Sequence, residues 1–269
     1  MPHPTAGSAD VAAADDRPFD LTGRVAVVTG ARRGLGRAIA VALARAGADV
    51  GLGLRDVDDD GGAVAEIEAL GRRAVPLAMD VLDVEASRAA LDTAAEALGG
   101  LDVLVNNAGG GIPSAPAAEV SLDDFDHVWA WNVRSAFALS QHAAKRMRSA
   151  GGGAIVNMAS QAGLVALPGE SAYCIAKAAV VHMTRCHAVE WGVDGIRVNA
   201  VAPTFIETDG TEAALGDPAF RADTVERIAA LHRIGVPREV ADAVVFLAAP
   251  AASLITGQTL AIDGGWTAR

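Results

Sequence analysis

Short runs of apolar, β-branched residues alternate along the chain with longer, alanine-rich amphipathic stretches. The short runs predict buried β-strands, and the amphipathic stretches predict helices that pack against a sheet. The expected strands are Val25 to Thr29, Asp49 to Leu54, Ala74 to Met79, Val103 to Val105, Ala154 to Met158, Ile196 to Ala200 and Thr259 to Ile262. The expected helices are Leu35 to Ala46, Gly62 to Leu70, Val84 to Leu98, Leu122 to Ser149 and Ser171 to Val193.

This alternation predicts a parallel sheet, because right-handed crossovers through helices connect parallel strands. The strand runs are uninterrupted rather than alternating, so we expect both of their faces to be buried. The predicted fold is α/β: a single-domain, Rossmann-like, doubly wound parallel sheet of about seven strands with helices on both faces. We expect this domain to cover residues 20–269, after a flexible N-terminal tail at residues 1–19.

Composition narrows the classes of partner. The net charge of −11 argues against a nucleic-acid surface, because phosphate binding needs a concentrated basic face. No apolar run reaches the ~18 residues of a membrane span, so we expect no membrane contact and a cytoplasmic protein. The histidines show no metal-ligand spacing, and no metal is expected. Cys174 and Cys186 lie on one predicted helix, roughly 18 Å apart, too far to pair.

Glycines follow the first predicted strand and lead into the first predicted helix. Glycines at this place allow a tight turn and let the backbone approach a pyrophosphate, which binds the free N–H groups of the helix start. We therefore expect a dinucleotide phosphate loop. Its cofactor-contacting residues would be Gly30, Arg32, Arg33, Gly34, Leu35 and Gly36.

The spacing of these glycines, with gaps of three and one after Thr29, resembles the classical short-chain dehydrogenase/reductase family. Further motifs across residues 20–267 support the resemblance. These are Asp80-Val81 after the third strand, Asn106-Asn107-Ala108-Gly109 after the fourth, Trp131-Asn132-Val133, Ser160 thirteen residues before Tyr173, and Tyr173-x-x-x-Lys177. The segment Pro203-Thr204-Phe205-Ile206-Glu207-Thr208 matches another family motif, except that Thr204 replaces a glycine.

The resemblance implies hydride transfer between a nicotinamide and a carbonyl or alcohol. The implied catalytic residues are Asn132, Ser160, Tyr173 and Lys177. Further implied cofactor contacts are Asp80, Val81, Asn107, Ala108, Gly109, Tyr173, Lys177, Pro203, Thr204, Ile206 and Thr208. In the family the lysine also binds the nicotinamide ribose, and the asparagine holds a water that links the lysine to solvent.

The chemistry of Tyr173 and Lys177 can also be argued directly. A free tyrosine has a pKa near 10 and is a poor base at neutral pH. Lys177 lies one helical turn from Tyr173, and an ammonium at that distance would lower the pKa of the phenol. Ser160 can donate a hydrogen bond to the substrate oxygen. Tyr173 is the single tyrosine of the chain, so the phenol has no substitute.

The end of the second strand bears on the choice of cofactor. An acid there binds the ribose 2′-hydroxyl of NAD, whereas arginine accommodates the 2′-phosphate of NADP. Leu54 stands at the acid's position, followed by Arg55, which together with Arg33 would form a phosphate clamp. Asp56, Asp58, Asp59 and Asp60 follow directly and would repel the phosphate. NADP(H) is favoured, with NAD(H) as the alternative.

Residues 205–233 match the segment that is a mobile lid over the substrate in the family; we name them the lid segment. Candidate substrate contacts are Ser160, Gln161, Tyr173 and Phe205, with Gly163, Pro168 and Trp266 as further pocket residues. The polar groups of Gln161 and Thr204 suit a hydroxylated substrate. The chain resembles sugar, sugar-acid and polyol dehydrogenases within the family, and the resemblance implies a homotetramer.

Two alternatives remain open at the level of the sequence. A 3-oxoacyl-[acyl-carrier-protein] reductase shares every motif above and would need a basic patch, for which Lys145, Arg146 and Arg148 are candidates. A non-catalytic, nucleotide-sensing regulator would keep the fold without turnover, although the catalytic motif is intact.

Overall fold

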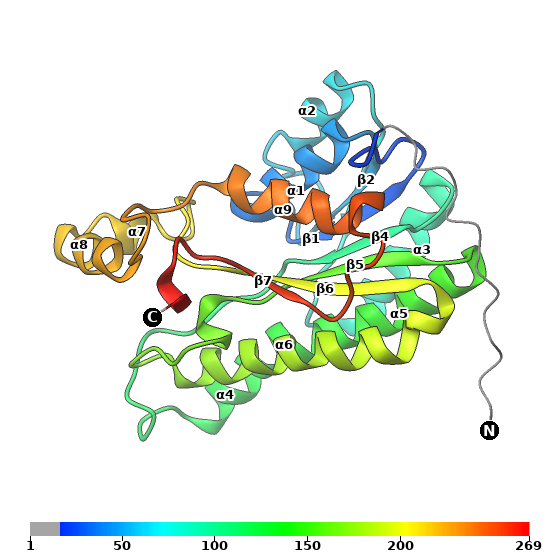
Figure 1. The fold of residues 1–269 in the computed structure, drawn as a ribbon. Helices are drawn as coiled ribbons and strands as arrows, with labels where there is room; N and C mark the ends of the chain where they lie inside the picture. The colour runs from blue at the N-terminus through cyan, green and yellow to red at the C-terminus, as the bar shows by residue number, and fades with distance from the viewer. Residues whose placement is uncertain (1–16, 269) are drawn as a thin grey trace.

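The computed structural model describes residues 17–268, so most of the predicted N-terminal tail lies outside the described residues. Seven strands form one sheet (Figure 1). They are β1 (Val25–Thr29), β2 (Asp49–Leu54), β3 (Ala74–Ala78), β4 (Val103–Asn106), β5 (Gly153–Met158), β6 (Ile196–Pro203) and β7 (Thr259–Ile262). The main helices are α1 (Gly34–Arg45), α2 (Ala63–Ala69), α3 (Val84–Leu98), α4 (Leu122–Trp129), α5 (Ser135–Ala150), α6 (Ser171–Trp191) and α9 (Pro237–Ala248).

All paired strands of the sheet are parallel, in the order β3-β2-β1-β4-β5-β6-β7. The chain first adds β2 and β3 on one side of β1 and then crosses to add β4 on the other side. A crevice opens at such a reversal, outside the carboxyl ends of the strands, and ligands of open α/β sheets bind there. The predicted fold class is confirmed.

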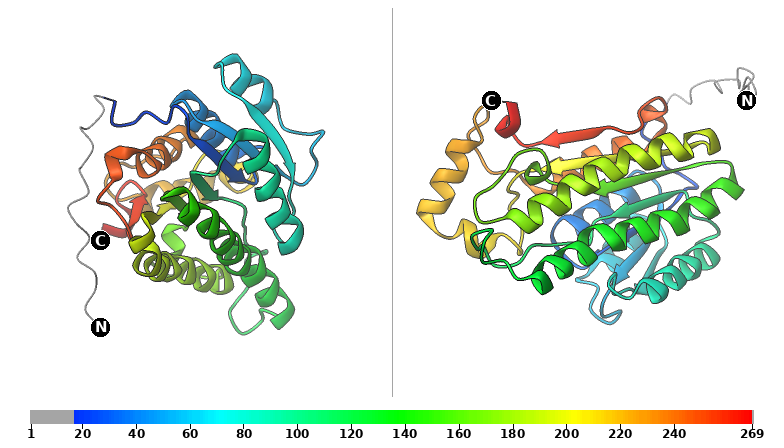
Figure 2. Two further views of the ribbon diagram at one scale, coloured as in Figure 1. Left: turned by 90° about the vertical axis from the view of Figure 1, so that its right-hand side faces the viewer. Right: turned by 90° about the horizontal axis from the view of Figure 1, so that it is seen from below.

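Helices cover both faces of the sheet. α1 and α9 pack together on one face around a core that contains Ile39, Val50 and Val244 (Figure 1). α3, α5 and part of α6 cover the other face over Leu104 and Ile155. Seen from below, α5 and α6 run side by side along the sheet, and the lid segment projects beyond one end of it (Figure 2).

Three sequence-based expectations about elements need correction. The helix expected from Leu122 to Ser149 contains a π-helical turn at Ala130–Arg134, between α4 and α5. The amide of Asn132 donates to the carbonyl of Val128 at 2.8 Å inside this turn. A buried amide that bonds the helix backbone accompanies this local widening, and π-turns are frequent at functional sites.

The edge strands differ from the expected burial on both faces. In β3 and β7 most residues are partly or largely exposed, because each of these strands has a neighbour on one side only. Within the lid segment, the sequence predicts a helical stretch from about Asp209 to Arg233, but the structure has two short helices there, α7 (Glu212–Leu215) and α8 (Pro218–Arg227), joined by turns. No helix among residues 17–268 has the length and hydropathy needed to cross a bilayer.

Candidate active site

The turn between β1 and α1 is built by close backbone approach. Gly30 and Gly34 have φ angles of +65° and +55°, a left-handed conformation that favours glycine. A Cβ at Gly36 would overlap the carbonyl oxygen of Gly30 and lie 2.6 Å from Nδ2 of Asn107. No side chain caps α1, and its first turn carries no acid. The turn therefore has the steric and electrostatic properties of a dinucleotide phosphate site.

The loop after β4 is tied to the end of β1. The backbone N–H groups of Asn107 and Ala108 donate to Oγ1 of Thr29 at 2.9 and 2.8 Å. The Asn107 amide donates to the carbonyls of Thr29 and Gly30, at 2.8 and 3.2 Å. Its side chain thus fixes the phosphate loop, so a cofactor contact from Asn107 would come from its backbone.

The arginines expected at the ribose differ in their surroundings. Arg32 forms an ion pair with Asp59 at 2.5 Å, so this guanidinium is engaged within the protein. Arg33 and Arg55 are exposed, and their guanidinium groups form no hydrogen bond or ion pair with any residue of the described chain. Leu54 is buried, at 1% exposure, and offers no polar group.

The acids that follow Arg55 are less free to repel a phosphate than their sequence suggests. Asp59 is paired with Arg32. Asp60 accepts the N–H groups of Gly62 and Val64 at the start of α2, at 2.9 and 2.7 Å. Asp56 and Asp58 stay exposed without an ion pair in the described chain, so the repulsion that remains comes from these two acids. Two residues after β3, the exposed Asp80 precedes Val81, which is buried.

The remaining cofactor candidates lie close to the phosphate loop. A Cβ at Gly34 would lie 3.5 Å from Cβ of Thr208, which places the segment after β6 beside the turn. Ile206, in this segment, is buried, and its carbonyl accepts Oγ1 of Thr211. Thr204 follows Pro203 at the end of β6, and its buried Oγ1 has no partner within residues 17–268. This unpaired hydroxyl is available to a bound group, which fits a cofactor or substrate at this position.

Three segments bring the four predicted catalytic residues together. Tyr173 and Lys177 come from the first turns of α6, Ser160 follows β5, and Asn132 lies in the π-turn. Nζ of Lys177 lies 5.5 Å from the centre of the Tyr173 ring. A Cβ at Gly109 would lie 2.5 Å from Oδ1 of Asn132 and 3.5 Å from Nζ of Lys177, so these two side chains flank the same point.

Hydrogen bonds to the backbone hold the side chains of Lys177 and Asn132 in place. Nζ of Lys177 donates to the carbonyl of Met158 at 2.8 Å. The Asn132 amide donates to the carbonyl of Gly110 at 2.8 Å, and its Oδ1 accepts the Gly110 N–H at 3.2 Å. Asn132 thereby links the widened helix to the loop after β4.

Ser160 has a partner that the sequence does not reveal. Its hydroxyl donates to Oε1 of Gln161 at 2.7 Å and accepts the N–H of Ala162 at 3.1 Å. A substrate oxygen that takes the Ser160 proton must therefore replace Gln161 as the acceptor.

The prediction that Lys177 lowers the pKa of Tyr173 is wrong for the protein without a bound cofactor. Burial raises the pKa of Tyr173 to about 12; a hydrogen bond with Ser160 opposes this shift, and the Glu170 carboxylate adds to it. Burial likewise lowers the pKa of Lys177 to about 8. Removal from water is the main cause of both shifts, since a low-dielectric site disfavours each charged form.

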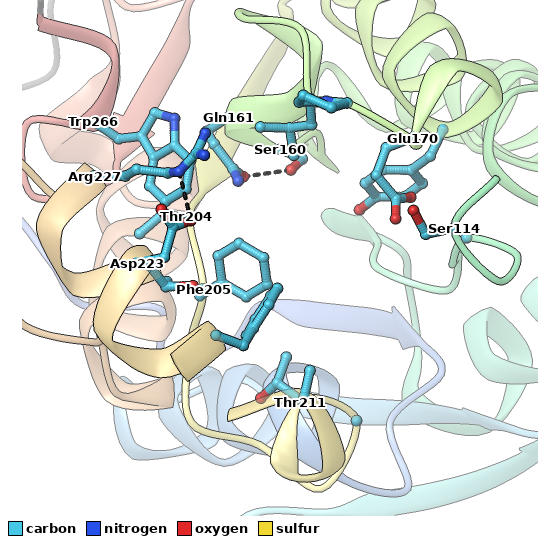
Figure 3. A pocket seen from close by; sticks show the side chains of 18 residues that line it. Ser114, Ser160, Gln161, Glu170, Thr204, Phe205, Thr211, Asp223, Arg227 and Trp266 are labelled. Carbon is cyan, nitrogen blue, oxygen red and sulfur yellow. Dashed lines mark hydrogen bonds and ion pairs between the residues drawn. The ribbon is translucent and has the colours of Figure 1, made fainter. Parts of the chain in front are cut away.

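A cavity of about 660 Å³ opens beside Ser160 and Tyr173 (Figure 3). Of the predicted substrate residues, Gln161, Pro168, Phe205 and Trp266 line it. Gly163 does not, because a Cβ there would lie 2.7 Å from the Lys177 backbone. The cavity is also lined by polar residues that we did not predict: Ser114, Glu170, Thr211, Asp223 and Arg227.

Phe205 anchors the lid side of the cavity. Its ring packs edge-on against Phe220 of α8, with 5.4 Å between centroids, and lies 6.0 Å from Trp266 near the C-terminus. Arg227 pairs with Asp223 at 2.7 Å across one turn of α8. Among residues 17–268, no cluster of histidine, cysteine and acidic side chains has the arrangement of a metal site.

Comparison with known proteins identifies the family. The model of the family described as "Enoyl-(Acyl carrier protein) reductase" matches residues 30–267. The chain is 43% identical to D-threitol dehydrogenase of Mycolicibacterium smegmatis, covering 94% of this chain and 96% of the relative. It is 39% identical to 2-dehydro-3-deoxy-D-gluconate 5-dehydrogenase of Escherichia coli, covering 93% and 98%.

Among solved structures, a gluconate 5-dehydrogenase of Burkholderia cenocepacia in complex with NADP and tartrate superposes with a TM-score of 0.89. It is 33% identical over 94% of this chain and 98% of that chain. The chain belongs to the short-chain dehydrogenase/reductase family. It is an oxidoreductase of the class that transfers a hydride between a nicotinamide cofactor and a CH–OH group.

Proposed function

We propose that the protein interconverts a small polyol, sugar or sugar acid and the corresponding ketone, with NADP(H) as the favoured cofactor. The observation that carries this proposal is the placing of the Ser160 and Tyr173 hydroxyls at a cavity that also has the polar side chains of Gln161, Glu170 and Thr204 in its wall. Relatives named for D-threitol and for sugar acids support the substrate class.

The proposed roles of the catalytic residues follow from their contacts. The nicotinamide supplies or accepts the hydride. Tyr173 gives a proton to the substrate oxygen during reduction and removes it during oxidation, and Ser160 donates a hydrogen bond to the same oxygen. Lys177, held by Met158, keeps its charge near the phenol, and Asn132 holds the loop at Gly110.

The proposed preference for NADP(H) rests on Arg33 and Arg55. Both guanidinium groups are without protein partners in the described chain, whereas the nearby Asp59 is neutralised by Arg32. A 2′-phosphate would give these arginines the charge-assisted hydrogen bonds that they lack. The NADP in the gluconate 5-dehydrogenase structure is consistent with this choice. NAD(H) stays the alternative.

The test is a spectrophotometric screen of ketones with NADPH and NADH, and of polyols and sugar acids with NADP and NAD. We expect turnover of hydroxylated substrates, with a lower KM for NADP(H) than for NAD(H). The absence of turnover across the whole panel, together with measurable cofactor binding, would favour the nucleotide-sensing regulator instead.

The alternative as an acyl-carrier-protein reductase loses support from the candidate basic patch. Arg146 pairs with Asp92 at 2.6 Å, and Arg148 pairs with Asp194 at 2.7 Å, which leaves Lys145 as the free cation of the three. These residues lie at the end of α5 that leads into β5. They are therefore near the amino-terminal ends of the strands, whereas the cavity lies beyond the carboxyl ends. Activity with acetoacetyl thioesters above that with polyols would reverse this preference.

We further propose a homotetramer in the cytoplasm. Apolar side chains remain exposed on α4, α5 and α6, among them Trp129, Phe137 and Val189, and helices with such faces can pair in a symmetric assembly. The exposed, free Cys186 suits a reducing compartment. Light scattering after size exclusion should give four times the chain mass of 27.3 kDa. Cell fractionation tests the compartment.

A further inference from the structure

Glu170 is a partly buried acid that the proposed mechanism does not use. It is the N-cap residue of α6 and stands three residues before Tyr173. It lines the cavity together with Ser114 and Gly111. Glu170 and Ser114 lie on the side of the cavity away from Arg227 and Trp266 (Figure 3).

Contacts around Gly111 place the Glu170 carboxylate next to the Tyr173 ring. A Cβ at Gly111 would lie 3.7 Å from Oε2 of Glu170 and 3.7 Å from Cδ2 of Tyr173. The loop that carries Ser114 is held against this helix start, because the N–H of Ala115 donates to the carbonyl of Gly169 at 3.0 Å. Glu170 is therefore a fixed wall of the cavity next to the phenol.

The carboxylate lacks a partner in the protein. Within residues 17–268 it forms no hydrogen bond or ion pair, and burial raises the pKa of Glu170. A half-buried carboxylate without a donor is costly, so a ligand that supplies an O–H group at this place gains affinity. A carbonyl oxygen cannot supply it, because it has no hydrogen to donate.

We infer that Glu170 selects substrates with a hydroxyl group on the carbon next to the reacting carbon, namely vicinal diols and the corresponding α-hydroxyketones. The reacting oxygen is hydrogen-bonded to Tyr173 and Ser160, so the group that donates a hydrogen bond to Glu170 must be a second hydroxyl of the substrate. Glu170 lines the same cavity as Tyr173 and Ser160, so a hydroxyl beside the reacting carbon can reach its carboxylate. This inference rests on the proposed function and narrows its substrate class.

The test compares two ketones that differ by this hydroxyl alone, 3-hydroxybutan-2-one and butan-2-one, each reduced with NADPH. The wild-type protein should have the higher kcat/KM for the hydroxyketone. Glu170→Gln should lower kcat/KM for the hydroxyketone by about 10- to 100-fold, as expected for loss of a hydrogen bond to a charged acceptor. For butan-2-one the change should stay below about threefold.

The matched control is Glu190→Gln, which removes the same charge from the exposed side of α6. It should leave both ketones unaffected. Cofactor affinity and Tm should be unchanged in Glu170→Gln, which separates recognition from a structural role. Equal losses for the two ketones, or a hydroxyketone rate at the wild-type level, would overturn the inference. Failure of the wild-type protein to reduce any ketone would instead refute the proposed function and the inference with it.

Discussion

The two sides of the site are held together in different ways. At the phosphate loop, residues 29–36 interlock with residues 106–109 through four hydrogen bonds from Asn107 and Ala108 and through the contact at Gly36. The lid segment is held by a small apolar cluster that includes Leu215, Ile228 and Ile234, and by ion pairs such as Arg221–Glu207 and Arg233–Glu239, whose side chains are 36–52% exposed. Exposed ion pairs contribute about 0–1 kcal/mol each.

This difference separates a cofactor side locked by close backbone approach from a substrate side held by a small separate cluster and exposed ion pairs. Elements that open and close are drawn from the least stable parts of a fold. We therefore propose that the lid segment closes over the substrate, while the phosphate loop keeps its shape. Tyr173 lies at the boundary of the two sides.

Tyr173→Phe removes the hydroxyl at the boundary while keeping the ring. We expect kcat to fall by about 10²- to 10⁴-fold, the range for a lost general acid. Cofactor binding should stay within about twofold, because the phosphate loop is built from other segments. Steady-state kinetics and fluorescence titration of NADPH measure the two effects. A near-normal rate would refute the role of Tyr173.

Matched glycine-to-alanine changes compare the two sides directly. Gly36→Ala should lower the free energy of unfolding by about 1–3 kcal/mol and weaken cofactor binding, because the added methyl overlaps the Gly30 carbonyl. Gly210→Ala in the lid segment should change stability by less than about 0.5 kcal/mol, since the nearest atom to its Cβ is Oγ1 of Thr208 at 3.7 Å. Urea denaturation gives both values; equal effects would contradict the contrast.

Arg55→Ala tests the charge of the cofactor side. We expect the Kd of NADPH to rise by about tenfold or more and that of NADH by less than about twofold, because a 2′-phosphate is present in the first cofactor alone. Arg45→Ala removes an equal charge at the far end of α1 and serves as the control. Parallel weakening of both cofactors by Arg55→Ala would remove the argument for a phosphate clamp.

The buried Lys177 gives a pH dependence with a defined sign. Its pKa is about 8 in the folded protein and 10.5 ordinarily, so the folded state binds this proton less tightly than the unfolded state does. The resulting cost is complete below pH 8 and disappears as the pH rises toward 10.5, so stability should increase over this window. Above pH 10, Tyr173 acts in the opposite direction, because its folded pKa of about 12 exceeds its ordinary 10.0.

Urea denaturation between pH 7.5 and 9.5, roughly the window of the Lys177 shift, measures this dependence. Lys177→Met should remove it, whereas Lys145→Met, at an exposed position of α5, should preserve it. An unchanged pH dependence in Lys177→Met would show that another group is responsible.

The same contrast explains what the sequence could predict. The phosphate loop and the Tyr173–Lys177 pair depend on local spacing, and a glycine forced by close approach leaves a readable pattern. The approach of Ser114 and Arg227 to one cavity depends on the packing of segments that are distant in the sequence. Glu170 was within reach, since its i, i+3 relation to Tyr173 is a local one.

The pKa shifts were outside what sequence reasoning could supply. Spacing placed Lys177 beside Tyr173, but it did not show that both groups are buried, and burial decides the sign of both shifts. The π-turn at Asn132 was missed for a similar reason, because the apolar periodicity continues on either side of it.

The hydrogen bond from Ser160 to Gln161 has a consequence for how affinity is distributed. If a substrate carbonyl accepts this hydrogen bond as proposed, one neutral hydrogen bond is exchanged for another, so Ser160 contributes little net energy to binding the ground state. Discrimination among ligands is then left to the cavity walls. Changes of substrate preference could arise there while the reacting hydroxyls stay untouched.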